Sequence, residues 1–204
     1  IIAYSIEAAL KSGLFEEVMV STDDEEIAAV AMQYGAKVPF MRSAETANDY
    51  ATTFDVIEEV LNTYKAEERF FDVVCCIYAT APFVSDVKLQ TSYRSLVENG
   101  YDSVYAVVAY SYPVQRGLKM EQGRMSMLYP EYLNTRSQDL KPVYHDAGQF
   151  YFSKVKSLEE SKSFLGNNTG GIICSELEVQ DLDTETDWKL AEMKYRLLHE
   201  KDIF

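Results

Sequence analysis

The spacing of apolar and polar positions predicts a series of amphipathic helices and short strands. Helical spacing of apolar residues occurs in residues 4–12, 25–34, 54–64, 86–99 and 188–198. Short apolar runs that predict strands occupy residues 17–21, 73–77, 103–109 and 149–152. Gly13 and Gly100 follow two of the helices and are expected at their C-caps. Residues 118–128 alternate around Gln122-Gly123 and are predicted to form a β-hairpin.

Helices and strands alternate along most of the chain, which indicates an α/β domain. Residues 73–77, Val-Val-Cys-Cys-Ile, are typical of a strand that is buried on both faces of a parallel sheet. The strand 17–21 leads into the acidic turn Thr22-Asp23-Asp24-Glu25, which carries the residues of a helix cap. Because α/β proteins bind ligands at the carboxyl ends of such strands, the turns after residues 21 and 77 are candidate positions for a site.

Composition narrows the class of protein. With 204 residues, of which 47% are hydrophobic, the chain is long enough for one α/β domain and too short for two large ones. A net charge of −14 argues against a general nucleic-acid binder, because such binding depends on Lys and Arg. We find no membrane-spanning run and no basic signal-peptide start in the sequence, so we expect a cytoplasmic protein. Its three cysteines lie in apolar runs, as small buried side chains do.

The segment 179–183, Val-Gln-Asp-Leu-Asp, contains the best candidate for a metal site. If it ends a strand, Asp181 and Asp183 point to one side of the strand and Leu182 to the other. Two carboxylates on one side suit Mg²⁺, which leaves its remaining positions to water and substrate phosphates. The alternative is that Thr184 or Asp183 caps the helix that follows, and that the acids are solvated.

The polar loop 41–53 is a second candidate. It offers Arg42, several hydroxyl groups and a helix N-terminus, a combination that favours an anionic ligand. The alternative is an ordinary long connection in which Thr52 or Thr53 is the N-cap.

The run 134–152 is a third candidate, because it combines Arg, His, Gln and Asp with aromatic residues. Such a mixture suits a polyhydroxylated anion: Arg binds a carboxylate, amides and acids bind hydroxyl groups, and rings pack on apolar faces. The alternative is a solvated loop that leads into a strand at 149–152. His145 alone is a weak acid–base candidate, since histidine is as often structural as catalytic.

Several segments together resemble the acylneuraminate cytidylyltransferase family, the synthetases of CMP-activated nonulosonic acids. The first resembling segments are Val-Ser-Thr-Asp-Asp-Glu-Glu-Ile at 20–27, Gly35-Ala36, Pro39-Phe40 and the loop from Arg42 through Asp49 to Thr53. The later ones are Ala-Thr-Ala-Pro-Phe at 79–83, Asp-Leu-Asp-Thr at 181–184 and Asp187-Trp188. Their shared order across nearly the whole chain is more specific than any one of them. Residues 77–83 and 144–151 are most similar to family members that act on pseudaminic acid, whereas sialic acid enzymes usually have Gln at the position of Tyr78.

The resemblance implies that the anomeric hydroxyl of a nonulosonic acid, here pseudaminic acid, attacks the α-phosphorus of CTP. The products are a CMP-sugar, for glycosylation of a surface polysaccharide or flagellin, and pyrophosphate. Asp181 and Asp183 are implied to be the catalytic carboxylates that hold Mg²⁺. The implied nucleotide contacts are Arg42, Ala51, Thr53 and Thr80, and the implied sugar contacts are Tyr78, Arg136, Gln138, His145 and Gln149. Positioning and electrostatics are expected to supply the catalysis, rather than covalent chemistry.

The resemblance also implies a Rossmann-like three-layer nucleotidyltransferase fold of the nucleotide-diphospho-sugar transferase type. Its sheet is expected to be mixed and mostly parallel, with a protruding hairpin arm through which the chain forms a homodimer. The family's first strand and its phosphate-binding loop, Arg-x-Gly-Ser-Lys…Lys-Asn, are expected just before Ile1 and do not occur in residues 1–204. We therefore expect a single domain that lacks them, with weak CTP binding.

Other functions stay open on the sequence. Within the family, the substrate could instead be sialic or legionaminic acid, which share a carboxylate and the ring carbon frame. An Asp-x-Asp segment also serves metal-dependent glycosyltransferases that use a nucleotide-sugar donor. A third hypothesis is an acidic domain of the same fold that binds a partner and has no activity.

Overall fold

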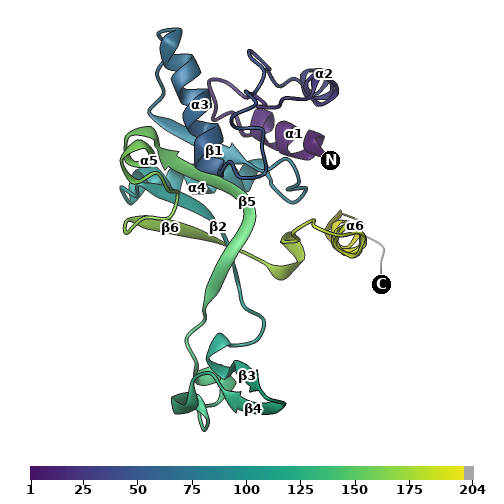
Figure 1. The fold of residues 1–204 in the computed structure, drawn as a ribbon, viewed down its shortest axis with the longest axis vertical. Coiled ribbons are helices and arrows are strands. Elements are labelled where there is room, and N and C mark those ends of the chain that lie inside the picture. The colour runs from purple at the N-terminus through teal and green to yellow at the C-terminus, as the bar shows by residue number, and fades with distance from the viewer. Residues whose placement is uncertain (200–204) are drawn as a thin grey trace.

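The structure, a computed structural model, describes residues 1–199 and has three layers (Figure 1). Its central sheet has four strands in the order β1 (Val73–Ile77), β5 (Tyr144–Lys154), β2 (Ser103–Ala109) and β6 (Thr169–Cys174). One face of this sheet packs against α1 (Ile2–Ser12) and α4 (Asp86–Glu98). The other face packs against α3 (Thr53–Ala66) and α5 (Val155–Ser161). The expected α/β class and three-layer arrangement are confirmed.

The two cores follow from the alternation of side chains along each strand. On β5, Phe150 and Phe152 are fully buried in the core beneath α4. Tyr151, between them, lies on the opposite face with Phe54 of α3 and Phe164. A one-residue change of register would exchange the two faces, so the phenylalanines and the tyrosine together define the register of the central strand.

The sheet is mixed, but most of its pairings are antiparallel, so the expectation of a mostly parallel sheet is wrong. β5 runs antiparallel to both of its neighbours, β1 and β2, and only β2 and β6 pair in parallel. The reason is that the chain returns from the arm into the gap between β1 and β2 and enters it from the opposite end. Within residues 1–199 no other strand pairs with the free side of β1, so β1 is an edge strand. It is only half buried, although its apolar sequence predicted burial on both faces.

The predicted helices begin and end close to where the sequence places them, whereas α5 and the strand β6 were not predicted. Gly13 ends α1 in the left-handed conformation, with φ of 65°. Asp24 caps α2 (Glu25–Gln33) by accepting hydrogen bonds from two backbone N–H groups. Ser85 caps α4, and Thr52 caps α3. Within residues 1–199, no helix combines the length and the apolar character that a membrane crossing requires.

The predicted strand 17–21 is not formed, and neither is the strand considered as one possibility for residues 179–183. Within residues 17–21 only Met19 has strand pairing, a single parallel bridge to Lys37. Residues 179–183 are irregular and lie between the 3-10 helix η4 (Glu176–Glu178) and α6 (Glu185–His199). The helix-capping alternative for Thr184 is confirmed: its hydroxyl accepts from the N–H of Asp187, and the Asp187 carboxylate accepts from Thr184 in return.

The predicted hairpin is confirmed and forms the tip of a long arm (Figure 1). Its strands are β3 (Leu118–Glu121) and β4 (Arg124–Met127), joined by Gln122 and Gly123, which both have positive φ as a type I′ turn requires. The 3-10 helices η1 (Val114–Arg116), η2 (Pro130–Tyr132) and η3 (Ser137–Asp139) complete the arm. Its large apolar side chains are exposed, among them those of Leu118, Met120, Met125, Leu128 and Leu133.

Candidate active site

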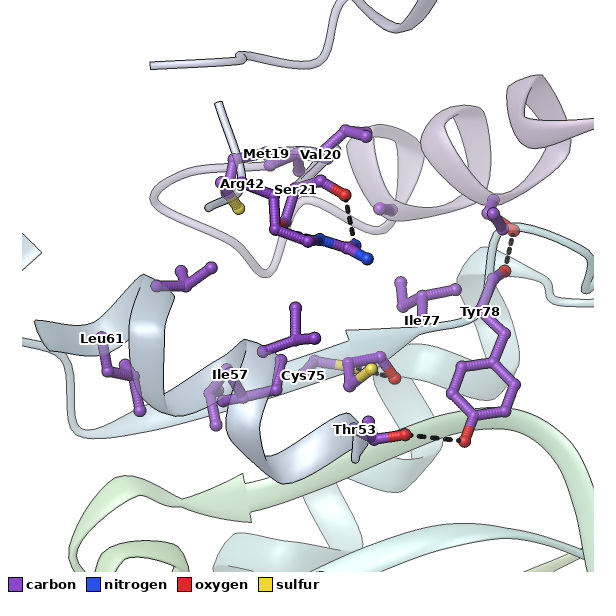
Figure 2. A pocket seen from close by; sticks show the side chains of 18 of the residues that line it. Met19, Val20, Ser21, Arg42, Thr53, Ile57, Leu61, Cys75, Ile77 and Tyr78 are labelled. Atoms are coloured by element: carbon purple, nitrogen blue, oxygen red, sulfur yellow. Dashed lines mark hydrogen bonds between the residues drawn. The ribbon is translucent and has the colours of Figure 1, made fainter. Parts of the chain in front are cut away.

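A cavity of about 510 Å³ lies between α1, α3, β1 and the segment 17–21 (Figure 2). The whole of β1, the edge strand of the sheet, lines it, together with apolar side chains of α1 and α3. Polar side chains also contribute to its lining, among them those of Ser21, Arg42, Thr46, Asn48, Thr53 and Tyr78. These polar groups are the part of the cavity suited to a nucleotide, because a charged ligand needs hydrogen-bonding partners when it leaves water.

Arg42 is held at the carboxyl end of segment 17–21. Its Nε donates to the Ser21 hydroxyl at 3.0 Å and its Nη2 donates to the Ser21 carbonyl at 2.6 Å. Two of the five guanidinium N–H groups are used in this way, which leaves donors for an anionic or carbonyl-bearing ligand. Burial raises the pKa of the Cys76 thiol to about 12, although the charge of Arg42 acts in the opposite direction. Cys76 is therefore a neutral thiol at physiological pH and is not a nucleophile.

Hydrogen bonds attach the loop 41–53 to α3, so it is not a loose connection. Glu59 on α3 accepts from the N–H of Ser43 and from the hydroxyl of Thr46. Burial opposes ionisation of Glu59, but these hydrogen bonds outweigh it and lower its pKa. At the start of the helix, Thr52 and Asp55 form a reciprocal capping box. The confirmed cap at Thr52 places Thr53, the first helical residue, at the cavity.

Thr53 and Tyr78 meet at the cavity. Their hydroxyl oxygens lie 3.2 Å apart, and the bond links the start of α3 to the residue after β1 (Figure 2). Two of the predicted nucleotide contacts, Arg42 and Ala51, line the same cavity. The structure thus brings together three predicted nucleotide contacts and one predicted sugar contact.

Glu17 fixes the other wall of the cavity. Its carboxylate is 4% exposed and pairs with Lys37 at 2.8 Å and Arg69 at 3.0 Å, and it accepts from the Tyr64 hydroxyl. Burial acts to raise the pKa of Glu17, but these three partners lower it to about 2. The sequence did not indicate Glu17 as a site residue, because its partners lie 20 to 52 positions away in the chain.

Other predicted residues lie away from this cavity. Thr80 is exposed in the turn after β1 and does not line it. Arg136 and Gln138 are exposed on the arm, beside and within η3. His145 is exposed near the start of β5, with its ring 4.7 Å from that of Tyr110 and its Nδ1 2.8 Å from the carbonyl of Asp146. Their predicted roles stay predictions.

Gln149 is buried and attaches η4 to the sheet. Its side chain is among the least exposed polar groups, at 3%, and its Nε2 donates to the carbonyl of Glu178. Glu178 in turn pairs with Lys88 at 3.1 Å. Burial opposes ionisation of Glu178, but hydrogen bonds from Ser175 and Lys88 lower its pKa. In this position Gln149 supports the segment that leads to Asp181, and it does not line the cavity.

Asp181 and Asp183 are exposed in the irregular segment before α6, outside the cavity lining. Within residues 1–199, no group of three or more His, Cys, Asp or Glu side chains is arranged to hold a metal. Two exposed carboxylates nevertheless fit Mg²⁺, which takes one or two protein carboxylates and completes its shell with water and phosphate oxygens. The oxygen-only donor set therefore fits the ion if a nucleotide supplies further ligands.

Asp146 and Tyr151 are two further polar groups near the cavity that sequence reasoning did not assign. The Tyr151 hydroxyl donates to the Asp146 carboxylate at 2.7 Å, and the Tyr151 ring lies 5.3 Å from that of Tyr78. Gly148, immediately before the predicted strand 149–152, is the signal in the sequence that could have indicated irregular backbone between them.

A family model described as Cytidylyltransferase matches residues 1–166. The chain belongs to this family. This cytidylyltransferase is 38% identical over 202 residues to a pseudaminic acid cytidylyltransferase of Campylobacter jejuni, in an alignment that covers 98% of this chain and 87% of that relative. It is 32% identical over 210 residues to a CMP-N,N'-diacetyllegionaminic acid synthase of Legionella pneumophila, with the same coverage of both chains.

The fold of this cytidylyltransferase is similar to that of solved nucleotidyltransferases. One is a CMP:2-keto-3-deoxy-manno-octonic acid synthetase complexed with CTP, with a TM-score of 0.65, 15% identity, and coverage of 98% of this chain and 88% of that one. Another is the 4-diphosphocytidyl-2C-methyl-D-erythritol synthase of Anaerococcus prevotii, with a TM-score of 0.63, 12% identity, and coverage of 97% and 85%. At these identities the likeness shows the fold. The expected nucleotidyltransferase fold is confirmed.

Proposed function

We propose that this enzyme acts in the cytoplasm and couples CTP to a nonulosonic acid, with pseudaminic acid as its substrate. The observation that carries the proposal is the hydrogen bond between Thr53 and Tyr78 at the cavity that Arg42 also lines. This bond joins Thr53, an expected nucleotide contact, to Tyr78, an expected sugar contact. A reaction between two bound substrates requires such contacts to lie close together. The Campylobacter jejuni relative, which is a pseudaminic acid cytidylyltransferase by name, supports the choice of acid.

In the proposed reaction, the anomeric hydroxyl oxygen of the acid forms a bond to the α-phosphorus of CTP. The bond from that phosphorus to the bridging oxygen of the β-phosphate breaks, and pyrophosphate leaves with the electron pair. The hydroxyl proton passes to solvent. Arg42 orients the nucleotide through its free donors, and the Thr53 and Tyr78 hydroxyls orient the groups next to the reacting atoms. These residues position the substrates and form no covalent intermediate.

We propose Mg²⁺ as the metal, held by Asp181 and Asp183. When bound, it would neutralise charge on the phosphates. The carboxylates themselves lie on a segment that is anchored on both sides, by Gln149 and Lys88 at η4 and by the Thr184 cap at α6. This anchoring keeps the two acids in a limited region of the surface while leaving them accessible.

We also propose a homodimer that forms through the arm. Arg136 and Gln138 are predicted sugar contacts, but their own arm carries them away from the cavity of the same chain (Figure 1). They can serve a cavity only if the arm of a second subunit approaches it. The exposed apolar side chains of the arm offer a surface for that approach, because isolated exposed hairpins with several large apolar groups gain free energy when they are covered.

The test is pyrophosphate release from CTP and Mg²⁺, with pseudaminic, legionaminic, sialic and 2-keto-3-deoxy-manno-octonic acids supplied separately. A second protein carries a strand and a basic phosphate loop before Ile1, because the family resemblance predicts these features there. Release with pseudaminic acid alone would support the proposal. Release with legionaminic acid instead would favour the activity named in the Legionella relative.

If neither protein releases pyrophosphate with any of the acids, the proposed reaction is contradicted. If the extended protein releases pyrophosphate and the present chain does not, the missing activity of the present chain is due to weak phosphate binding. A thermal-shift titration with CTP, with and without Mg²⁺, distinguishes weak binding from none, because a ligand that binds only the folded state raises its melting temperature.

A further inference from the structure

The segment 179–183, which carries both proposed Mg²⁺ ligands, has no regular structure of its own. It joins η4 to α6, to one side of the sheet (Figure 1). A short connection keeps one shape only where other groups hold its backbone, because each residue without such a contact retains conformational freedom. The contacts of this backbone therefore decide where the carboxylates of Asp181 and Asp183 lie.

Two side chains hold successive carbonyl groups at the start of this segment. Gln149 of β5 donates to the carbonyl of Glu178. Lys194 of α6 donates through Nζ to the carbonyl of Val179 at 2.6 Å. Val179 is extended, with φ of −134° and ψ of 126°, and in extended backbone successive carbonyls point to opposite sides. The sheet thus holds the chain from one side and α6 holds it from the other.

The other end of the segment is held by the first turn of α6. Thr184 and Asp187 form their reciprocal cap there, and the Gln180 side chain donates to the Asp187 carboxylate at 3.3 Å. Residues 180–183 lie between these two attachments. Because α6 supplies Lys194 as well as the cap, one helix fixes both ends of the stretch that contains the two carboxylates.

The position of Lys194 is not explained by an ion pair. Within residues 1–199, no carboxylate oxygen lies within 4 Å of its Nζ. The side chain is half-buried, and a partly desolvated ammonium group is costly unless its N–H donors are used. The bond to the Val179 carbonyl is therefore the contact that keeps Lys194 in this position.

We propose that Lys194 is a positioning residue for the Mg²⁺ ligands Asp181 and Asp183. Its bond to Val179, opposite the bond from Gln149, places both carboxylates in one region before an ion binds. An ion that meets ordered ligands binds more tightly, because its binding does not have to order the backbone. Lys194 lies outside the cavity lining, so its effect passes through the backbone that it holds. The proposal rests on the proposed function, since it takes the metal ligands assigned there.

The first test needs no turnover and titrates the protein with Mn²⁺ alone, followed by water-proton relaxation. Binding at this site is the part of the signal that Asp183→Asn removes. Lys194→Met keeps the apolar stem and removes the donors, and it is expected to raise the Kd for Mn²⁺ about tenfold, as loss of a group behind a metal ligand does. Loss of a positive charge alone would strengthen cation binding, so weaker binding cannot come from charge.

Lys189→Met is the matched control. Lys189 is an exposed lysine of the same helix, so the substitution makes the same change in charge and should not weaken Mn²⁺ binding. Melting temperatures of all variants within a few degrees of wild type exclude loss of fold as the cause.

A second test follows the segment itself by hydrogen exchange. Deuterium uptake by a peptide that covers residues 178–184 is expected to be faster in Lys194→Met and unchanged in Lys189→Met, because local opening exposes amide groups to exchange. Unchanged uptake in Lys194→Met would show that the bond to Val179 does not order the segment. Faster uptake with an unchanged Kd for Mn²⁺ would overturn the positioning role.

Kinetics distinguish positioning from direct contact with a substrate. In Lys194→Met, the Mg²⁺ concentration that gives half-maximal pyrophosphate release is expected to rise about tenfold. At saturating Mg²⁺, kcat and the KM for CTP should stay close to wild type. A raised KM for CTP at saturating Mg²⁺ would mean that Lys194 contacts the nucleotide, and would overturn the inference.

The inference and the proposed function can fail separately. Equal Mn²⁺ binding by the wild-type protein and Asp183→Asn would overturn the metal assignment and the role of Lys194 with it. If Lys194→Met weakens Mn²⁺ binding as expected but the wild-type protein releases no pyrophosphate with any acid, the proposed reaction fails and the role of Lys194 stands.

Discussion

The hydroxyl groups of Thr53 and Tyr78 lie 3.2 Å apart and connect α3 to the end of β1. The two residues are 25 positions apart in the chain, and neither belongs to a motif that requires the other. Their contact brings the loop 41–53 and the segment 77–83, both part of the family resemblance, to one cavity. The roles of the two residues can therefore be tested against each other.

Tyr78→Phe is expected to raise the KM for the acid about tenfold, because it removes one hydroxyl and keeps the ring that packs on Tyr151. The KM for CTP should change less. Steady-state kinetics with each substrate varied in turn checks this. Tyr93→Phe on α4 is the control, because Tyr93 lies outside the cavity lining. Equal increases in both KM values would assign Tyr78 a general structural role.

Arg42→Lys is expected to lower kcat/KM for CTP by about a factor of ten or more. Lysine keeps the charge but cannot form both bonds to Ser21 with the geometry of a guanidinium. The matched control is Arg94→Lys at an exposed position of α4. An unchanged kcat/KM for CTP in Arg42→Lys would contradict the nucleotide assignment.

Asp183→Asn is expected to abolish pyrophosphate release while the melting temperature stays within a few degrees of wild type. The side chain is exposed, so its loss removes a predicted Mg²⁺ ligand without emptying the core. Chelation of Mg²⁺ should abolish pyrophosphate release by the wild-type enzyme in the same assay. Glu160→Gln serves as the control acid. Full activity of Asp183→Asn would refute the metal assignment.

The double substitution Met120→Glu and Met125→Glu is expected to shift the protein from dimer to monomer in analytical ultracentrifugation. The two methionines are paired across β3 and β4 and are 68% and 54% exposed, so charges there disrupt a partner surface and not the core. Met32→Glu on α2, 55% exposed, controls for the added charge. A wild-type protein that is a monomer at all concentrations would contradict the dimer.

Glu17→Gln is expected to lower the free energy of unfolding at pH 7 by about 3 kcal/mol, the value for a carboxyl whose pKa falls from 4.5 to about 2 on folding. Because the pKa is depressed in the folded state, this stability is complete above pH 4.5 and is lost as the pH falls toward 2. Urea unfolding across that range should show the two proteins converge at low pH. The exposed neighbour Glu16→Gln should show no such convergence.

Local features of the fold were predictable because their causes are local. Gly13 ends α1, Thr52 caps α3, and Gln122-Gly123 turns the hairpin, each through the conformation or hydrogen bond of a few adjacent residues. The strand at 73–77 was predicted with its bounds, but its burial was not. Burial depends on which strands lie beside it, and that information is distributed over the whole chain.

Some of the predicted site residues lie together in the structure, and their roles stay predictions. Arg42, Ala51, Thr53 and Tyr78 gather at one cavity, as a common role requires. The ion pairs of Glu17 were not predicted, because they join segments that are distant in the chain. The contact between Asp146 and Tyr151 was not predicted either, because a bulge in β5 turns Asp146 to the opposite face of the sheet from the one that strand alternation gives it. Gly148 indicated irregular backbone at that point without indicating its direction.

By itself, then, the sequence determined most of the helices, three of the central strands in whole or in part, the hairpin and the family, because periodicity, caps and turn residues act over a few neighbours and motifs keep their order along the chain. It did not indicate α5 or β6. Only the tertiary structure decided that β5 enters between β1 and β2 in the opposite direction, and that Thr53, Tyr78, Tyr151 and Asp146 adjoin. These relationships depend on packing between segments far apart in the chain, where the burial of whole faces outweighs any local preference.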